Sequence, residues 1–530
     1  MLISHTLKYL PAQLLSPLAQ LVSVIVWTHW LSPAEMGVFT LVTVTQELAY
    51  LGCLGWFAIY ALRYLPPRED AEGLATYLGT ENAVVLASMA ASALVATLTC
   101  WALPGPHPFW ATSLTLTLFF ASKALNLHYA ERARAQSAFV TYSILQIVGP
   151  VGGLGLGWLA LQHGEPSALW LLGAYATAQV LGTLLALPGL GMQWRPARPD
   201  LAVLRAAALF GGPVLMLSAL GWVAENYIRY LVQWHAGTAA LGLMIVGWSL
   251  GRRCAAVAST LVTTASFPLA ARLLNDNRRG EALAQLRLNA ALMVAVLLPV
   301  TAALQVLGPA LVALVVAPVY QQVTSELLGL AVLGSALRNL HMHTSDQLMV
   351  LDRQIGMVAR IDAVEIALCA AASLVGLLVS GPGVSGLRGA LVGQALGSLA
   401  TLALSLWWAH HRLGLRWPWM ANAKVALATA LMLLVLAQLP VGQGVAGLVG
   451  SVLAGAGVYA GACGLIFATG LRRRWAQYQS QRGMHPASAA SPRSTPSPSS
   501  APSASSAAPT VAPAVSLHAR LVNPAPPEMR

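Results

Sequence analysis

The stretch GWSLGRRCAAVASTLV, residues 247–262, places two adjacent arginines inside a long apolar run. The apolar character begins upstream near Ala239 and continues to Ala271. A run of about 20 apolar residues is long enough to cross a bilayer as a helix. An arginine near the middle of such a span costs roughly 2.5–3.5 kcal/mol on insertion scales. Arg252 and Arg253 therefore predict a protein interior that can pair or hydrate two guanidinium groups.

The composition of the whole chain agrees with a membrane protein. Hydrophobic residues make up 57% of the sequence and charged residues only 9%, whereas a soluble domain has about 25% charged residues. So few charges cannot cover a surface that faces water. The five cysteines all lie in apolar runs, which is typical of small packing residues rather than disulfides or metal ligands. The fold class predicted is an all-α, polytopic membrane protein.

Apolar runs of the required length recur along the chain and predict about fourteen transmembrane helices. The predicted spans are 10–30, 38–61, 82–103, 109–130, 138–162, 167–188, 207–231, 239–270, 288–312, 324–350, 357–380, 387–410, 425–440 and 445–470. We expect two six-helix lobes, 1–205 and 206–424, and then a helix pair with a basic end, 425–482. A Ser/Pro/Ala-rich tail follows at 483–530; it cannot bury a core and is expected to be disordered.

A weak internal repeat supports the two lobes. Ala34 and Gly37, between the first two spans, match Ala239 and Gly242, between spans seven and eight. Parallel repeats of this kind are a known plan of membrane transporters. Under the same offset Glu47 corresponds to Arg252. Opposite charges at corresponding heights predict a polar cavity between the lobes.

The net charge of +12 is distributed unevenly among the loops. The loops 31–37, 104–108, 163–166, 232–238, 313–323, 381–386 and 441–444 contain no Lys or Arg. The alternate loops carry Arg63, Arg68, Arg132, Arg134, Arg195, Arg198, Arg205, Arg272, Arg278, Arg279, Arg287, Arg353, Arg412, Arg416, Lys424, Arg472, Arg473 and Arg474. This alternation reflects orientation in a membrane rather than nucleic-acid binding. By the positive-inside rule, both termini are expected in the cytoplasm.

Span seven carries a polar stripe that contains Glu225 and Arg229. Such a stripe faces protein or water rather than lipid. The two residues are four apart, so they can pair with each other. The pair is either a structural ion pair that holds span seven against a neighbouring helix or a part of a functional cavity.

Span ten is polar over a broad sector that includes Arg338, His341, His343 and Asp346. One neighbouring helix cannot satisfy so wide a sector, which suggests a water-filled cavity. The two histidines point about 200° apart on a helix, so they are not expected to share a metal ion. Beside Asp346 they are candidates for proton coupling, with plain hydrogen bonding as the alternative.

Three further charges lie inside predicted spans. Glu47 is either a partner for an arginine or a carrier of a proton or sodium ion, and Glu365 ranks with it as a coupling candidate. Lys123 is a candidate for ligand binding, although a lysine near a helix end also snorkels to the interface.

Arg252 and Arg253 differ by about 100° around the helix, so both can face a wide cavity. Together with Arg229 and Arg338 they predict a cationic pocket. Arginine suits a pyrophosphate because its planar fork donates bidentate, charge-assisted hydrogen bonds. The alternative is that each arginine neutralises Glu47, Glu225 or Asp346.

Several motifs resemble the oligosaccharide flippases of the polysaccharide transporter family, in the superfamily that also contains multidrug and toxic-compound extrusion transporters. They are LSPAEMGVFTLV at 31–42, ALRYL at 61–65, ENYIRYLV at 225–232, ALGLM at 240–244 and FPLAAR at 267–272. The family often has an Asp-Arg pair where this chain reads Ile228-Arg229, and the acidic neighbour here is Glu225, one turn earlier. The resemblance covers roughly residues 1–475.

The resemblance implies a transporter in the bacterial inner membrane that moves a polyprenyl-pyrophosphate-linked oligosaccharide from the cytoplasmic to the periplasmic leaflet. It also implies alternating access, contact with membrane lipids, and glycosyltransferases and a polysaccharide polymerase as partners. Three alternatives remain: a drug or cation antiporter of the same superfamily, a peptidoglycan-precursor flippase, and a membrane-embedded glycan polymerase, ligase or glycosyltransferase. No catalytic residues, metal site or cofactor are expected. The chain has no P-loop motif, so a proton or sodium gradient is the expected source of energy.

Overall fold

The computed structural model describes residues 2–67, 70–103, 105–190, 198–439 and 444–483, and these ranges contain helices and no strands. The elements are α1 (Leu2–Thr28), α2 (Pro33–Tyr50), η1 (Leu51–Gly55), α3 (Trp56–Tyr64), α4 (Ala71–Ala102), α5 (Phe109–Ala135), α6 (Phe139–Ile147), η2 (Val148–Gly152), α7 (Gly153–His163), α8 (Ala168–Leu190), α9 (Leu201–Asn275), α10 (Arg279–Val315), α11 (Pro318–His341), η3 (Met342–Asp346), α12 (Gln347–Leu351), α13 (Ile355–Val379), α14 (Val384–Trp408), η4 (Ala409–Leu413), α15 (Trp419–Gln438) and α16 (Gly444–Gly483).

Within the described residues these elements form fourteen continuous helical rods, as predicted. The η segments are single π-helical turns that follow directly on an α-helix; the first three run on into a further α-helix, and η4 ends its rod at Leu413. The long α9 is two rods, because Gly237 has a φ of 83° and breaks the helix there. Glycine is the residue that adopts a positive φ without strain.

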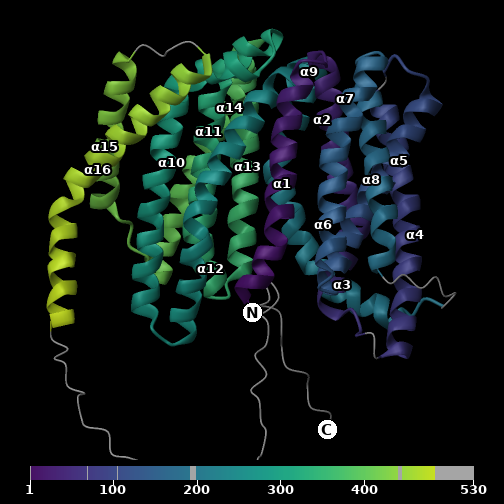
Figure 1. The fold of residues 1–530 in the computed structure, drawn as a ribbon, viewed down its shortest axis with the longest axis horizontal. Helices are drawn as coiled ribbons and strands as arrows, with labels where there is room; N and C mark the ends of the chain where they lie inside the picture. The colour runs from purple at the N-terminus through teal and green to yellow at the C-terminus, as the bar shows by residue number, and fades with distance from the viewer. Residues whose placement is uncertain (1, 68–69, 104, 191–197, 440–443, 484–530) are drawn as a thin grey trace, which may run out of the picture.

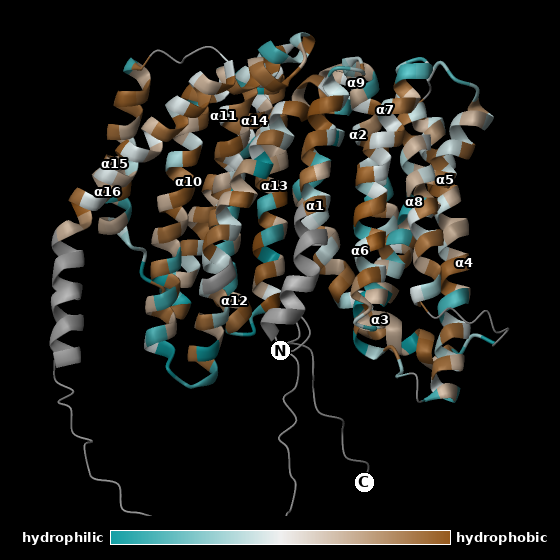
Figure 2. Ribbon diagram, in the orientation of Figure 1, coloured by the Kyte–Doolittle hydropathy of each residue, from teal (hydrophilic) through white to brown (hydrophobic). Residues whose placement is uncertain are grey.

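Ten of the described helices are long and apolar enough to cross a membrane, with both rods of α9 counted as one. Large apolar side chains are exposed along many of them, for example Leu86 and Leu94 on α4. In Figure 2 the brown of hydrophobic residues recurs along the helices, with lighter and teal residues between them. The chain is a multi-pass membrane protein. The rods missing from the ten include α5 and α11–α12, which carry interior charges such as Lys123 and Arg338 and are less uniformly apolar for that reason.

The helices form two bundles (Figure 1). We call α1–α8 the N-terminal bundle and α9–α14 the C-terminal bundle, while α15 and α16 lie against α10 at the outer edge of the C-terminal bundle. The bundles meet at the end of the molecule that carries the α1–α2 turn, which we call the closed end. The domain boundaries expected from the sequence stay predictions.

The predicted repeat forms the contact between the bundles at the closed end. A methyl group added at Gly37 on α2 would collide with the carbonyl oxygen of Thr238 on α9. A methyl group at Gly242 would in turn collide with the carbonyl oxygen of Pro33. The same sequence offset separates Gly37 from Gly242 and Pro33 from Thr238. The contact is therefore self-complementary, as at a two-fold axis.

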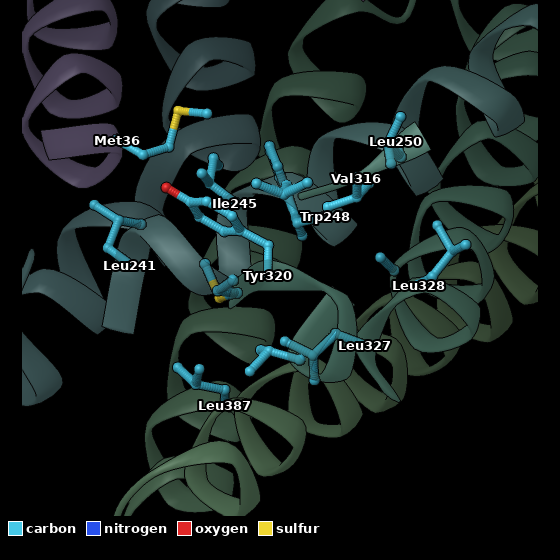
Figure 3. Close-up of a cluster of buried hydrophobic side chains, with 14 of the residues drawn as sticks. Met36, Leu241, Ile245, Trp248, Leu250, Val316, Tyr320, Leu327, Leu328 and Leu387 are labelled. Carbon is cyan, nitrogen blue, oxygen red and sulfur yellow. The ribbon is translucent and has the colours of Figure 1, made fainter. Parts of the chain in front are cut away.

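Hydrogen bonds add to this closure. The hydroxyl of Tyr320 on α11 donates to the carbonyl oxygen of Leu31 at 2.8 Å. The backbone N–H of Ala317 donates to Oγ1 of Thr28 at 3.2 Å. The largest buried apolar cluster surrounds these bonds and joins both bundles, with Met36 of α2 beside Ile245 and Tyr320 (Figure 3).

Some sequence expectations fall on residues outside the described ranges. Apart from Gly483, which ends α16, the tail expected to be disordered lies outside them, and so do Arg68 and Arg195. The side chains of Arg472, Arg473 and Arg474 are likewise not described.

Candidate functional site

A cavity of about 510 Å³ lies between the N-terminal bundle and α9. Its lining comes from α1, α2, α5, α6, η2 and α8 on one side and from both rods of α9 on the other. Ligand pockets commonly have volumes of about 300–1,000 Å³. The cavity is therefore of the size of a ligand pocket.

Six charged side chains line this cavity in the part of the chain that the structure describes. They are Glu47, Lys123, Glu225, Arg229, Arg252 and Arg253, all expected from the sequence to have a role. They come from three helices that are far apart in the chain, α2, α5 and α9. Most of the residues predicted for the cationic pocket are thus brought together by the fold.

Four of these side chains form two ion pairs. Lys123 Nζ lies 3.6 Å from Glu47 Oε1, and Arg252 Nη1 donates to Glu225 Oε2 at 2.9 Å. Glu225, whose spacing allowed a pair with Arg229, is paired with Arg252 instead, which is the alternative in which an arginine of the second rod neutralises it. The second rod of α9 folds back beside the first, and Arg252 reaches the carboxylate from across the helix pair.

Arg229 and Arg253 form no ion pair with any described residue. The Arg229 guanidinium lies 4.9 Å from the ring centroid of Trp248, and the Arg252 guanidinium lies 5.1 Å from the same ring. Such cation–π contacts stabilise a charge that has left water. Arg253 Nη1 donates to the carbonyl oxygen of Pro17 on α1 at 3.4 Å. These contacts hold both arginines without a described carboxylate in ion-pair contact, and we call the two arginines uncompensated in this sense.

Arg338 lies away from the cavity lining. It is paired with Glu365 of α13, and both side chains are largely buried. His341 Nε2 lies 3.0 Å from Asp346 Oδ1, and His341 Nδ1 lies 3.9 Å from Glu365 Oε2. The four residues form one charged cluster inside the C-terminal bundle, which we call the C-bundle cluster.

His343 points away from the C-bundle cluster. Its Nδ1 lies 3.4 Å from Gln347 Nε2, and its carbonyl oxygen accepts a hydrogen bond from Asn289 at 2.8 Å. The π-helical turn η3, which spans Met342–Asp346, places Asp346 back against His341. The sequence predicted the polar sector here but not its separation from the cavity.

The sequence reasoning missed a buried charged cluster in the N-terminal bundle. Glu81 of α4 is 1% exposed and contacts His128 Nε2 and Arg132 Nη1 of α5, each at 2.8 Å. Arg132, expected in a loop, is a buried part of α5 and also donates to the carbonyl oxygen of Leu190. His128 and Arg132 are four apart, a spacing that places both on one helix face and could have indicated the site.

The change Glu81→Gln should strongly destabilise the protein. It leaves the buried Arg132 guanidinium without its carboxylate, and breaking a buried ion pair costs about 3–5 kcal/mol. We expect a lower midpoint of thermal unfolding in detergent and a lower yield of folded protein. Glu131→Gln is the matched control, because Glu131 and Arg134 form a more exposed pair of little value to stability. Equal midpoints for the two variants would contradict this account.

The fold and the cavity define a class of protein, a two-bundle membrane protein with the fold of transporters of the multidrug/oligosaccharidyl-lipid/polysaccharide superfamily. The family described as "Polysaccharide biosynthesis protein" matches residues 108–325. This match and the structural matches confirm the resemblance to polysaccharide flippases expected from the sequence.

Three solved structures illustrate the shared fold. The lipid II flippase MurJ in an inward closed conformation matches with a TM-score of 0.64 at 11% identity, over 87% of this chain and 99% of that chain. A multidrug resistance MATE family transporter in an inward-facing conformation matches with a TM-score of 0.59 at 12% identity, over 77% and 98%. A superfamily transporter from Pyrococcus furiosus, described as having a binding pocket of reversed polarity, matches with a TM-score of 0.51 at 13% identity, over 78% and 94%. No curated protein was found to match the sequence.

Proposed function

We propose that this protein moves a polyprenyl-pyrophosphate-linked oligosaccharide across the bacterial inner membrane, from the cytoplasmic to the periplasmic leaflet, by alternating access. The observation that carries the proposal is the pair of uncompensated guanidinium groups, Arg229 and Arg253, in the cavity. A pyrophosphate diester carries two negative charges. The described lining carries four basic and two acidic side chains, so its excess charge has the right sign and size.

The shape of the molecule supports a transport cycle. The bundles are in close contact at the closed end through Gly37 and Gly242, and the cavity lies further along the same two helices. Opening the closed end requires separating these backbones and breaking the bond from Tyr320 to Leu31. Rigid bundles that rock about such a contact expose a central site to each side in turn.

The charge of the cavity also weighs against the antiporter alternative. A cationic drug binds best where carboxylates are in excess, and Glu47 and Glu225 are both occupied by basic partners. A membrane-embedded glycan polymerase or ligase is another alternative. Each of these alternatives predicts a result in the experiment below that differs from movement of the anionic lipid.

For energy, we propose coupling to a proton or sodium gradient. Glu47 and Glu225 are the candidates that line the cavity, and the C-bundle cluster of His341, Asp346 and Glu365 is the candidate outside it, with His343 nearby. A cavity carboxylate that takes up a cation releases its basic partner, Lys123 or Arg252, toward the substrate. Uptake of the coupling cation and binding of the substrate are thereby linked, because both change the net charge of the cavity.

Proteoliposomes that contain a fluorescent prenyl-pyrophosphoryl-N-acetylglucosamine test the proposal. The protein should move the lipid between leaflets at least tenfold faster than empty liposomes do, measured by chemical quenching from outside. An imposed proton or sodium gradient should change the rate at which the lipid moves in one direction across the bilayer. Efflux of a cationic dye without movement of the anionic lipid would instead establish the antiporter, and glycan elongation would establish the enzyme.

A further inference from the structure

The two walls of the cavity differ in chemistry. The α9 wall contains the uncompensated Arg229 and Arg253. The opposite wall, from the N-terminal bundle, contains the amides of Gln20, Asn126, Gln146 and Gln179 among the rings of Trp27, Phe39, Phe119 and Tyr175. Its charged members among the described residues are Glu47 and Lys123, which are paired with each other. This wall therefore suits an uncharged ligand group.

Asn126 is a buried amide on this opposite wall. The residue is 7% exposed, and its Nδ2 has no hydrogen-bond partner among the described residues. A buried polar group without a partner costs about 1–3 kcal/mol. The Nδ2 atom lies beside Gly182 and is closed off from the cavity, so a ligand does not remove this cost; the group that Asn126 offers to the cavity is its Oδ1, an acceptor.

Gln179 on the same wall has a free NH2 group, because the neighbouring Ser122 contacts the other end of its amide. Its Oε1 accepts a hydrogen bond from Ser122 Oγ at 2.9 Å, so the remaining hydrogen-bonding group of this amide is its NH2. Gln179 is one turn from Tyr175 on α8, and the Tyr175 hydroxyl donates to Ser23 Oγ at 3.0 Å. Contacts with the rings of Phe39 and Trp27 hold the Tyr175 ring further in place.

We propose that Asn126 and Gln179, with the ring of Tyr175, form a subsite for the uncharged sugar attached to the pyrophosphate. The NH2 of Gln179 donates to a hydroxyl or acetamido oxygen, the Oδ1 of Asn126 accepts from a sugar hydroxyl, and the aromatic ring packs against the apolar face of the sugar ring. A site built to hydrogen-bond a ligand group rejects an analogue that lacks the group, because its buried donors then stay unpaired. This inference rests on the proposed function, which places the pyrophosphate at Arg229 and Arg253.

Two probes of equal charge separate the sugar from the pyrophosphate. One is geranylgeranyl-pyrophosphoryl-N-acetylglucosamine, and the other is the P¹-geranylgeranyl-P²-methyl pyrophosphate diester, which has a methyl group in place of the sugar. The purified full-length protein in detergent should bind the sugar probe about tenfold more tightly than the methyl probe, as measured by tryptophan fluorescence. Asn126→Leu and Gln179→Met, made singly, should each weaken binding of the sugar probe severalfold and leave the methyl probe unchanged.

The controls distinguish failure of the subsite from failure of the proposed function. Gln322→Ala removes an exposed amide outside the cavity and should change neither affinity. Arg229→Gln should weaken both probes by similar factors. Equal affinity of the wild-type protein for both probes overturns the subsite but leaves the proposed function standing. Failure to bind either probe overturns the proposed function itself. A thermal melt of each variant identifies any loss of fold. If one amide variant has lost its fold, the binding data of the other amide variant decide whether the subsite exists.

Discussion

Replacing Arg229 and Arg253 together by glutamine is expected to reduce lipid movement in proteoliposomes on the order of 100-fold or more. Hydrogen bonds to charged groups contribute about 1.5–3 kcal/mol each, and the double change removes two such sets from the bound pyrophosphate. It also removes the excess positive charge of the cavity. Neither arginine has an ion-pair partner that the double change would leave unpaired, so the fold should survive.

Companion variants show whether charge or shape is responsible. Lysine at both positions keeps the charge but loses the planar fork, so it should restore part of the activity. Arg252→Gln should have a smaller effect, because the Arg252 guanidinium is already shared with Glu225. Arg278→Gln is the matched control, since Arg278 forms an exposed pair with Glu281 away from the cavity. Wild-type transport by the Arg229/Arg253 double variant would refute the assignment of the cavity.

Gly242→Leu is the second change with a large expected effect. No side chain fits where Gly242 of α9 meets the carbonyl oxygen of Pro33, so the closed end cannot form with leucine there. Overpacking costs about 1–3 kcal/mol and sometimes more, which shifts a two-state equilibrium by about 5- to 150-fold. We expect transport to be lost and the population to shift toward the state that is open at this end.

A cysteine placed at Thr43, which lines the cavity, reports that shift. A membrane-impermeant maleimide added on the side of the closed end should label it slowly in the otherwise unchanged protein and at least tenfold faster in the Gly242→Leu variant. The matched control is Gly457→Leu, because an added methyl group at Gly457 on α16 meets nothing within 4 Å. Unchanged labelling and transport in the Gly242→Leu variant would show that the closed end is not a gate.

The candidate site was predictable in part. The sequence indicated that Arg252 and Arg253 face a cavity, because lipid cannot hold adjacent guanidinium groups, and the structure places both in the cavity lining. It placed Arg338 in the same pocket, but the structure pairs Arg338 with Glu365. Both positions look alike along the chain, as arginines within apolar runs. Their difference comes from the side chains of other helices, which a local pattern does not contain.

The pairing of charges also could not be predicted from local sequence patterns. Glu225 has Arg229 one turn away on its own helix, yet Arg252 of the returning rod holds the carboxylate. Glu81 was overlooked because it lies at the edge of an apolar run, and only the approach of α5 identifies it as the centre of a buried cluster. An ion pair forms where the backbone brings two groups within a few ångströms, and spacing along one helix is only one of several ways to do so.

The sequence by itself determined that this protein lies in a membrane as about fourteen helices, since transfer of a helix into lipid depends on the hydrophobicity of that segment alone. It also indicated the repeat, because Ala34 and Gly37 match Ala239 and Gly242 at the same spacing. Only the tertiary structure decided which charges neutralise one another and which two, Arg229 and Arg253, remain for a ligand. Electrostatic energy falls with the distance between groups, and that distance is set by how distant helices pack.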